Sequence, residues 1–145
     1  MASSPITLPL STPAEAFAAI ALAAVACDGE LAALEARGLR QALEYRQPYC
    51  TYSDRAMAEL LDRLLQILRE QGWAALIHQA APLLQPPQRE TALAVAADLT
   101  RADRIETSDE QRFLRALAEQ LQIAPPRSAQ ILEVIGLLNS DSLAG

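Results

Sequence analysis

The chain has 145 residues, of which 51% are hydrophobic and only 4% are aromatic. This length and apolar fraction exclude a largely disordered chain and predict one domain around a single core. The 18 acidic residues outnumber the 12 basic ones, all of them arginine, and the net charge of −6 argues against nucleic acid as a partner.

The first predicted elements are an N-terminal arm and an alanine-rich helix. Residues 1–11 read as a flexible arm. We expect this arm to dock through three apolar side chains, Ile6, Leu8 and Leu10. The following TPAE predicts a helix start with Thr12 as N-cap and Glu15 as the reciprocal capping partner. The helix runs to about Cys27, and its small side chains allow neighbours to approach closely.

Six further helices are predicted from apolar residues at three-four spacing and from Gly, Pro and capping residues between them. Their expected ranges are about 30–46, 54–70 after an N-cap at Ser53, 73–84, from Pro86-Pro87 to 102, 108–121 and 125–138. The expected inward stripes of the last two helices are Phe113, Leu114, Leu117 and Leu121, and then Ile131, Val134, Ile135 and Leu138. No segment alternates with period two. The sequence therefore predicts an all-α fold of about seven helices, with one domain at 12–138 and a flexible tail at 139–145.

The cysteines and the longest apolar run bear on compartment. Cys27 and Cys50 match neither a disulfide framework nor a zinc spacing, because His78 is the single histidine. We therefore expect reduced thiols and a cytoplasmic protein. The longest uncharged run, residues 16–27, is too short to span a bilayer. No Lys or Arg precedes it, and Glu15 stands at its edge, so we expect no export signal.

Three tyrosines gather in the loop between the second and third predicted helices. They are Tyr45, Tyr49 and Tyr52. Tyrosine is enriched at protein interfaces, so this loop is one candidate contact surface. The other interpretation is a loop folded over the end of the bundle.

Two acidic turns share a pattern. The stretch DGELAALEARGLRQAL (28–43) aligns with DRIETSDEQRFLRALA (103–118), so that Asp28 matches Asp103 and Glu35 matches Glu110. Each copy follows an alanine-rich helix and opens a new amphipathic one. The pattern indicates a weak internal duplication of a helix-turn-helix unit.

The two glutamates of this pattern are expected on the apolar sides of their helices. Leu31, Glu35 and Leu39 follow one another at four-residue spacing, and Glu110 lies three residues before Phe113. A carboxylate that faces inward near a helix start needs hydrogen-bond donors, a cation or a proton.

Two interpretations of these carboxylates stay open. In the first, Thr107 caps the sixth helix, Glu110 completes a capping box, and Glu35 accepts backbone N–H groups of a nearby turn. In the second, several acidic oxygens bind a divalent cation such as Ca²⁺, Mg²⁺, Mn²⁺ or Zn²⁺, which the acidic charge favours. The candidate ligands are Asp28 and Glu35 in the first copy, and Asp98, Asp103, Glu106 and Glu110 in the second.

An Asp-Gly turn after an alanine-rich helix, with Glu seven residues later, stands at Asp28, Gly29 and Glu35. This motif resembles the tellurite-resistance TerB family. The opening LSTPAEAFAAIALAAVACDG (10–29) is similar to its cyanobacterial members. The stretches DRLLQILREQGWAALIHQAAPLL (62–84) and DEQRFLRALAEQLQI (109–123) resemble its later helices. The resemblance covers roughly 10–138. In the second copy Arg104 stands where the family pattern has Gly.

This resemblance implies an all-helical, internally duplicated domain associated with stress and tellurite resistance. It implies metal binding at the matching acidic positions, Asp28, Glu35, Asp103 and Glu110. It also implies that the protein acts in cytoplasmic complexes at the inner membrane, together with integral membrane proteins.

Three hypotheses of function follow. The first is a non-enzymatic interaction or sensing module that binds a divalent cation through Asp28, Glu35, Asp103, Glu106 and Glu110. The second is a metal-free protein–protein scaffold whose carboxylates only cap helices. The third is a small hydrolase, which has weak support because the sequence lacks a nucleophile-histidine-acid pattern and a phosphate-binding loop.

Overall fold

The computed structural model describes residues 8–27, 33–100, 108–140 and 142–143, and of residues 33–37 only the backbone. Within these ranges the chain forms seven α-helices and no strand, as the sequence predicts. The helices are α1 (Pro13–Ala26), α2 (Ala33–Glu44), α3 (Asp54–Gln71), α4 (Trp73–Ala80), α5 (Pro86–Thr100), α6 (Ser108–Gln120) and α7 (Pro125–Leu138). Two short 3₁₀ helices, Tyr49–Thr51 and Ala81–Leu83, lie in the connections.

Helix boundaries follow local chemistry. The predicted N-cap of α3 is confirmed, because the Ser53 hydroxyl accepts the N–H group of Ala56 at 3.0 Å. The same helix ends at Gly72, whose φ of 86° lies in the left-handed region that favours glycine. The next helix, α4, stops at Ala80 rather than near residue 84. Pro82 explains the early end, because it lacks the N–H group that a continuing helix would need.

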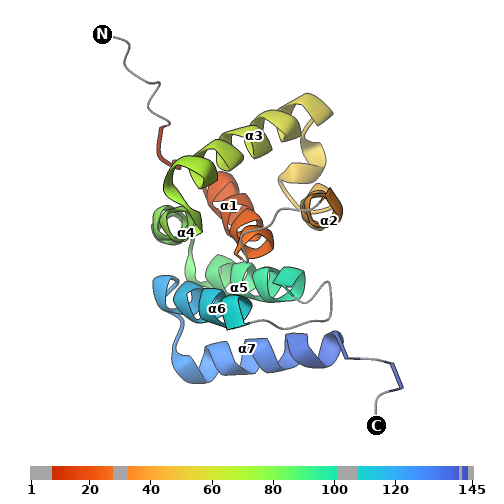
Figure 1. The fold of residues 1–145 in the computed structure, drawn as a ribbon, viewed down its shortest axis with the longest axis vertical. Helices are drawn as coiled ribbons and strands as arrows, with labels where there is room; N and C mark the ends of the chain where they lie inside the picture. The colour runs from red at the N-terminus through yellow and green to blue at the C-terminus, as the bar shows by residue number, and fades with distance from the viewer. Residues whose placement is uncertain (1–7, 28–32, 101–107, 141, 144–145) are drawn as a thin grey trace.

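The first helix is the centre of the bundle. Residues 18–26 of α1 are all buried, most of them alanines with almost no exposed surface. Helices α2, α3, α4 and α5 all contact α1, and Figure 1 shows it enclosed by them. Alanine has no atom beyond Cβ, so four helices can pack closely around one axis without steric conflict.

The fifth helix connects this group to the rest of the bundle. It contacts α1, α6 and α7, and in Figure 1 it lies between α1 and the α6–α7 pair. The inward stripe predicted for α6 is confirmed in full, with Phe113, Leu114, Leu117 and Leu121 buried. The rings of Phe113 and Trp73 meet edge to face with 5.2 Å between centroids, which joins α6 to α4.

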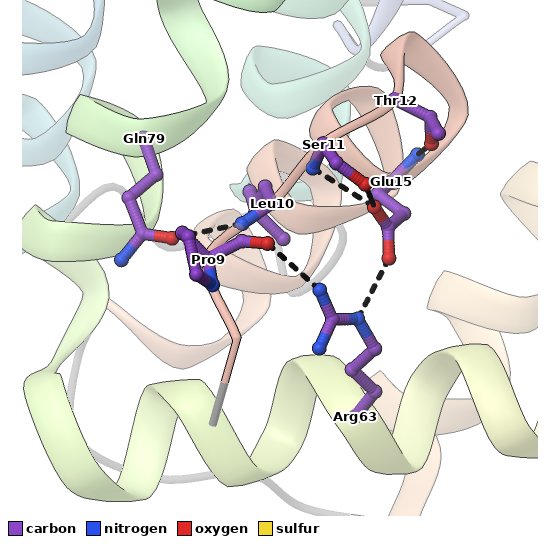
Figure 2. A network of polar contacts seen from close by, with 7 residues as sticks. All are labelled: Pro9, Leu10, Ser11, Thr12, Glu15, Arg63 and Gln79. Atoms are coloured by element: carbon purple, nitrogen blue, oxygen red, sulfur yellow. Dashed lines mark hydrogen bonds and ion pairs between the residues drawn. The ribbon is translucent and has the colours of Figure 1, made fainter. Parts of the chain in front are cut away.

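The described part of the N-terminal arm, residues 8–11, is held against the bundle (Figure 2). Leu10 is buried, and its N–H group donates to Oε1 of Gln79 at 3.1 Å. The carbonyl of Pro9 accepts from Nη2 of Arg63 at 2.9 Å. Of the three predicted docking residues Leu10 is therefore confirmed, whereas Leu8 is 69% exposed. Ile6 lies outside the described residues.

The start of α1 is capped as predicted, with one difference. The Thr12 hydroxyl accepts the N–H group of Glu15 at 3.1 Å. The Glu15 carboxylate does not accept the backbone N–H group of Thr12, as a reciprocal capping partner would. Its Oε1 accepts both the N–H and the hydroxyl of Ser11 at 3.0 Å, while Oε2 accepts from Nε of Arg63 at 2.7 Å (Figure 2). The partner that sequence reasoning missed, Arg63, comes from α3.

This network predicts a pH-dependent contribution to stability. Burial alone raises the pKa of Glu15, but the hydrogen bonds from Arg63 and Ser11 and the charge of Arg63 outweigh it, so the pKa lies below its ordinary value of 4.5. A lowered folded-state pKa stabilises the fold above pH 4.5, and this stabilisation is lost as the pH falls through the folded-state pKa.

Glu15→Gln is therefore expected to lower the free energy of unfolding by about 1 kcal/mol at neutral pH and hardly at all near pH 2. Urea denaturation at both pH values measures this difference. Glu59→Gln is the control, because Glu59 forms an exposed ion pair with Arg55 and should change stability little. An equal loss at both pH values for Glu15→Gln would show that its charge contributes nothing.

Candidate interaction surface

The structure describes two of the six predicted cation ligands in full. Asp28, Asp103 and Glu106 lie outside the described residues, and of Glu35 only the backbone, in α2, is described. Within the described ranges, no group of three or more His, Cys, Asp or Glu residues could hold a metal ion. The cation site therefore stays a prediction.

Glu110 occupies the predicted inward position. It lies in the first turn of α6, is 5% exposed, and is buried together with Phe113 and Leu114. The Glu110 carboxylate takes part in a polar interaction. The first turn of a helix favours negative charge, because the backbone N–H groups there point toward the helix start. Glu110 can therefore stabilise the start of α6, and it lies four residues after Glu106 and seven after Asp103 in the sequence.

Asp98, the other described candidate, has a structural partner. Its Oδ1 accepts from Nδ2 of Asn139 at 2.9 Å. Asn139 is the C-cap of α7, and the same Nδ2 donates to the carbonyl of Ile135 at 3.0 Å. Asp98 thus connects α5 to the end of α7, a role that its position in the sequence did not suggest.

Of the four residues predicted to face inward on α7, two do and two do not. Ile131 and Ile135 pack against the core, but Val134 is 60% exposed and Leu138 is 72% exposed. None of the residues of α7 is fully buried. The reason is the position of α7 at one end of the bundle, where it packs mainly against α5 (Figure 1). A helix that is covered on one side leaves its other side in water.

Leu137 extends the exposed side, because it is 69% exposed and lies three residues after Val134, which also neighbours Leu138 four residues further on. We call these three residues, Val134, Leu137 and Leu138, the α7 outer face. Large apolar side chains that cluster at a surface mark contact sites more often than singly scattered ones do. A signal for this face was present in the sequence. Six of the eight residues in ILEVIGLL (131–138) are apolar, too many for one buried stripe.

A groove of about 410 Å³ lies on a different side of α7, where it faces α6. Its apolar lining includes Leu114, Ala118, Ile123 and Leu132, with Arg115 and Glu119 as charged residues. Leu132 stands about 160° around the helix from Val134, since each residue turns by about 100°. The groove and the α7 outer face are therefore separate surfaces.

The tyrosine loop is mostly folded onto the bundle. Tyr49 is 2% exposed, its hydroxyl donates to the carbonyl of Ala14, and its ring contacts those of Phe17 and Tyr52. Tyr45 is the exception at 83% exposed. The cysteines are both free, with Cys27 buried and Cys50 exposed.

No helix in the part of the chain that the structure describes is long and apolar enough to cross a membrane. Comparison of the chain with family models, curated proteins and solved structures finds no match.

Proposed function

We propose that the chain is a non-enzymatic, cytoplasmic interaction module of the TerB type that binds a protein partner through the α7 outer face. The supporting observation is the exposure of Val134, Leu137 and Leu138, at 60%, 69% and 72%, on a helix with no fully buried residue. Transfer of such side chains out of water is favourable by about 1.5–3 kcal/mol each when complete. A partner that covers this face gains that free energy.

The proposed partner offers a shallow apolar groove to one side of α7. Recognition of a helix face by a groove uses side chains at three- and four-residue spacing, which is the spacing of 134, 137 and 138. The net charge of −6 would speed association with a partner whose groove has a basic rim. As a TerB-type module, the protein would act in stress or tellurite resistance, in a complex with membrane-associated proteins.

The test is co-purification of partners from the native cells with a tagged chain that carries Val134→Ser, Leu137→Ser and Leu138→Ser. We expect partner recovery to fall about tenfold or more, because apolar contacts at the centre of an interface dominate binding. The serines replace exposed residues, so the far-ultraviolet circular dichroism spectrum and the melting temperature should change little.

Leu8→Ser is the matched control, because Leu8 is equally exposed and lies outside α7. It should leave recovery unchanged. If the triple variant retains the same partners as the parent chain, α7 is not the binding surface. Sedimentation velocity on the parent chain and the triple variant shows whether the partner is a second copy.

A divalent cation that regulates this binding is the second candidate function. The observation that favours it is the burial of Glu110, which lies four residues after Glu106 and seven after Asp103. Calorimetric titration of chelator-treated protein, compared with Asp103→Asn/Glu110→Gln, tests the cation. The exposed Asp109→Asn is the control. Heat that saturates in the parent chain and disappears in the double variant supports a sensor, whereas flat titrations support the metal-free scaffold.

A further inference from the structure

A second cavity, of about 300 Å³, lies on another part of the molecule. Three segments form it: the start of α1, the loop between α2 and α3, and the start of α5 with the residue Leu84 before it. Its lining includes Phe17, Arg46, Tyr49, Leu84 and Gln88, together with three prolines. We call it the Arg46 pocket. Its volume is at the lower end of the range for ligand sites, enough for a small molecule or one side chain.

The floor of the Arg46 pocket is preformed. Tyr49 is fixed by the hydrogen bond from its hydroxyl to the carbonyl of Ala14 and by ring contacts with Phe17 and Tyr52, whose centroids lie 6.5 Å and 5.7 Å away. Burial raises the pKa of Tyr49, so its hydroxyl stays neutral and remains a donor. A site whose walls are already ordered loses little conformational entropy when a ligand enters.

Arg46 supplies a positive charge that no acidic side chain of the described ranges neutralises. Its guanidinium carbon lies 5.8 Å from the centroid of the Phe17 ring. Arg40, Arg63 and Arg127 each form an ion pair with a carboxylate. Among the residues that the structure describes, none forms such a pair with Arg46, and no Asp or Glu lines the pocket. Other described arginines, such as Arg69 and Arg112, also form no such pair, and what distinguishes Arg46 is its position at a cavity whose lining contains no Asp or Glu.

The start of α5 adds to the positive potential, because its first turn holds no acidic residue, whereas the start of α1 is offset by Glu15. Pro87 and Gln88 belong to this first turn of α5, and both line the pocket. Gln88 also offers donors. Its Oε1 accepts the N–H group of Gln85 at 2.8 Å, which fixes the amide and leaves the Nε2 hydrogens for a ligand.

From this combination we infer that the Arg46 pocket binds a monocarboxylate carried on an apolar group. The guanidinium fork matches the two oxygens of a carboxylate, and the proline, Phe17, Tyr49 and Leu84 surfaces cover an aromatic or branched aliphatic body. A dianion such as a phosphate monoester fits less well, because one arginine would leave one negative charge uncompensated beside an acidic protein. The ligand is either a free organic acid or the C-terminal carboxylate of a polypeptide.

The experiment is a titration of the full chain followed by nuclear magnetic resonance, with 3-phenylpropanoate and with a short peptide that ends in phenylalanine. Each is compared with its neutral amide. We expect both acids, or the better of the two, to bind about tenfold or more tightly than the matching amide, the effect of one charge-assisted contact. Tighter binding of the peptide identifies a polypeptide terminus as the ligand, and tighter binding of the free acid identifies a small molecule.

Arg46→Gln should remove the preference for acid over amide. Arg46→Lys should keep part of this preference, because lysine retains the positive charge but cannot donate two parallel N–H groups to one carboxylate. Arg55→Gln is the matched control, since Arg55 is exposed on α3 and does not line the pocket. Equal binding of acid and amide, no binding of either acid, or unchanged binding in Arg46→Gln would overturn the inference. The α7 outer face takes no part in this experiment, so its result is independent of the proposed function.

Discussion

Phe113→Ala is expected to lower the free energy of unfolding by about 3–5 kcal/mol, the largest effect of any single change considered. Phe113 has no exposed surface and is among the largest fully buried side chains. Its truncation leaves a cavity between α6 and α4 and removes the edge-to-face contact with Trp73. Because the total stability of a domain is about 5–15 kcal/mol, the variant should unfold at a much lower urea concentration.

Urea denaturation followed by circular dichroism measures this loss. Phe113→Leu, which keeps most of the volume, should lose clearly less than Phe113→Ala. Leu8→Ala removes an apolar side chain that is 69% exposed and should change the free energy of unfolding by less than about 0.5 kcal/mol. If Phe113→Ala and Leu8→Ala have similar effects, α6 is not packed into the core as described.

Ala19→Leu is expected to destabilise the chain by about 1–3 kcal/mol, although leucine is almost as good a helix former as alanine. Ala19 has no exposed surface and lies in the middle of α1, which four helices contact. A larger side chain there must displace one of these helices or adopt a strained rotamer. The expected loss is thus a direct consequence of the close approach that alanine permits.

Ala58→Leu is the matched control, because Ala58 is an exposed alanine in the interior of α3. Its effect should be close to zero. Thermal and urea denaturation of the two variants give the comparison. Equal stability of Ala19→Leu and the parent chain would mean that α1 has room around it and is not the packed centre of the bundle.

Local signals in the sequence predict most of the fold, because each depends on residues close together in the chain. Thr12 and Ser53 cap helices through the N–H group three residues later. Gly72 ends a helix through its own backbone conformation. The stripe of α6 is confirmed because it repeats at helical spacing and α6 has neighbours to cover it. Such features need no knowledge of distant segments.

Contacts between distant segments could not be predicted in this way. Periodicity shows that Val134 and Leu138 share a side of α7 with each other, but it does not show whether a neighbour covers that side. The ion pair of Glu15 with Arg63 joins residues 48 positions apart. Leu8 and Leu10 are equally apolar, yet only Leu10 meets the bundle.

The candidate site was predicted only in part. The inward position of Glu110 followed from its spacing to Phe113, and the structure bears it out. The role of Asp98 as a partner of Asn139 depends on the end of α7 returning to α5, which no local pattern encodes. The cation site and the TerB resemblance stay predictions. The apolar excess in 131–138 signals an exposed face on α7, but which residues form it, and the Arg46 pocket, are visible only in three dimensions.

Site-specific photo-cross-linking in the native cells tests directly whether α7 binds a protein partner. A photo-reactive phenylalanine analogue replaces Leu138 in one variant and Leu8 in another, two positions of similar exposure. If α7 binds a partner, we expect a discrete cross-linked protein at position 138 and none at position 8. No adduct at 138, or the same adducts at both positions, would contradict it.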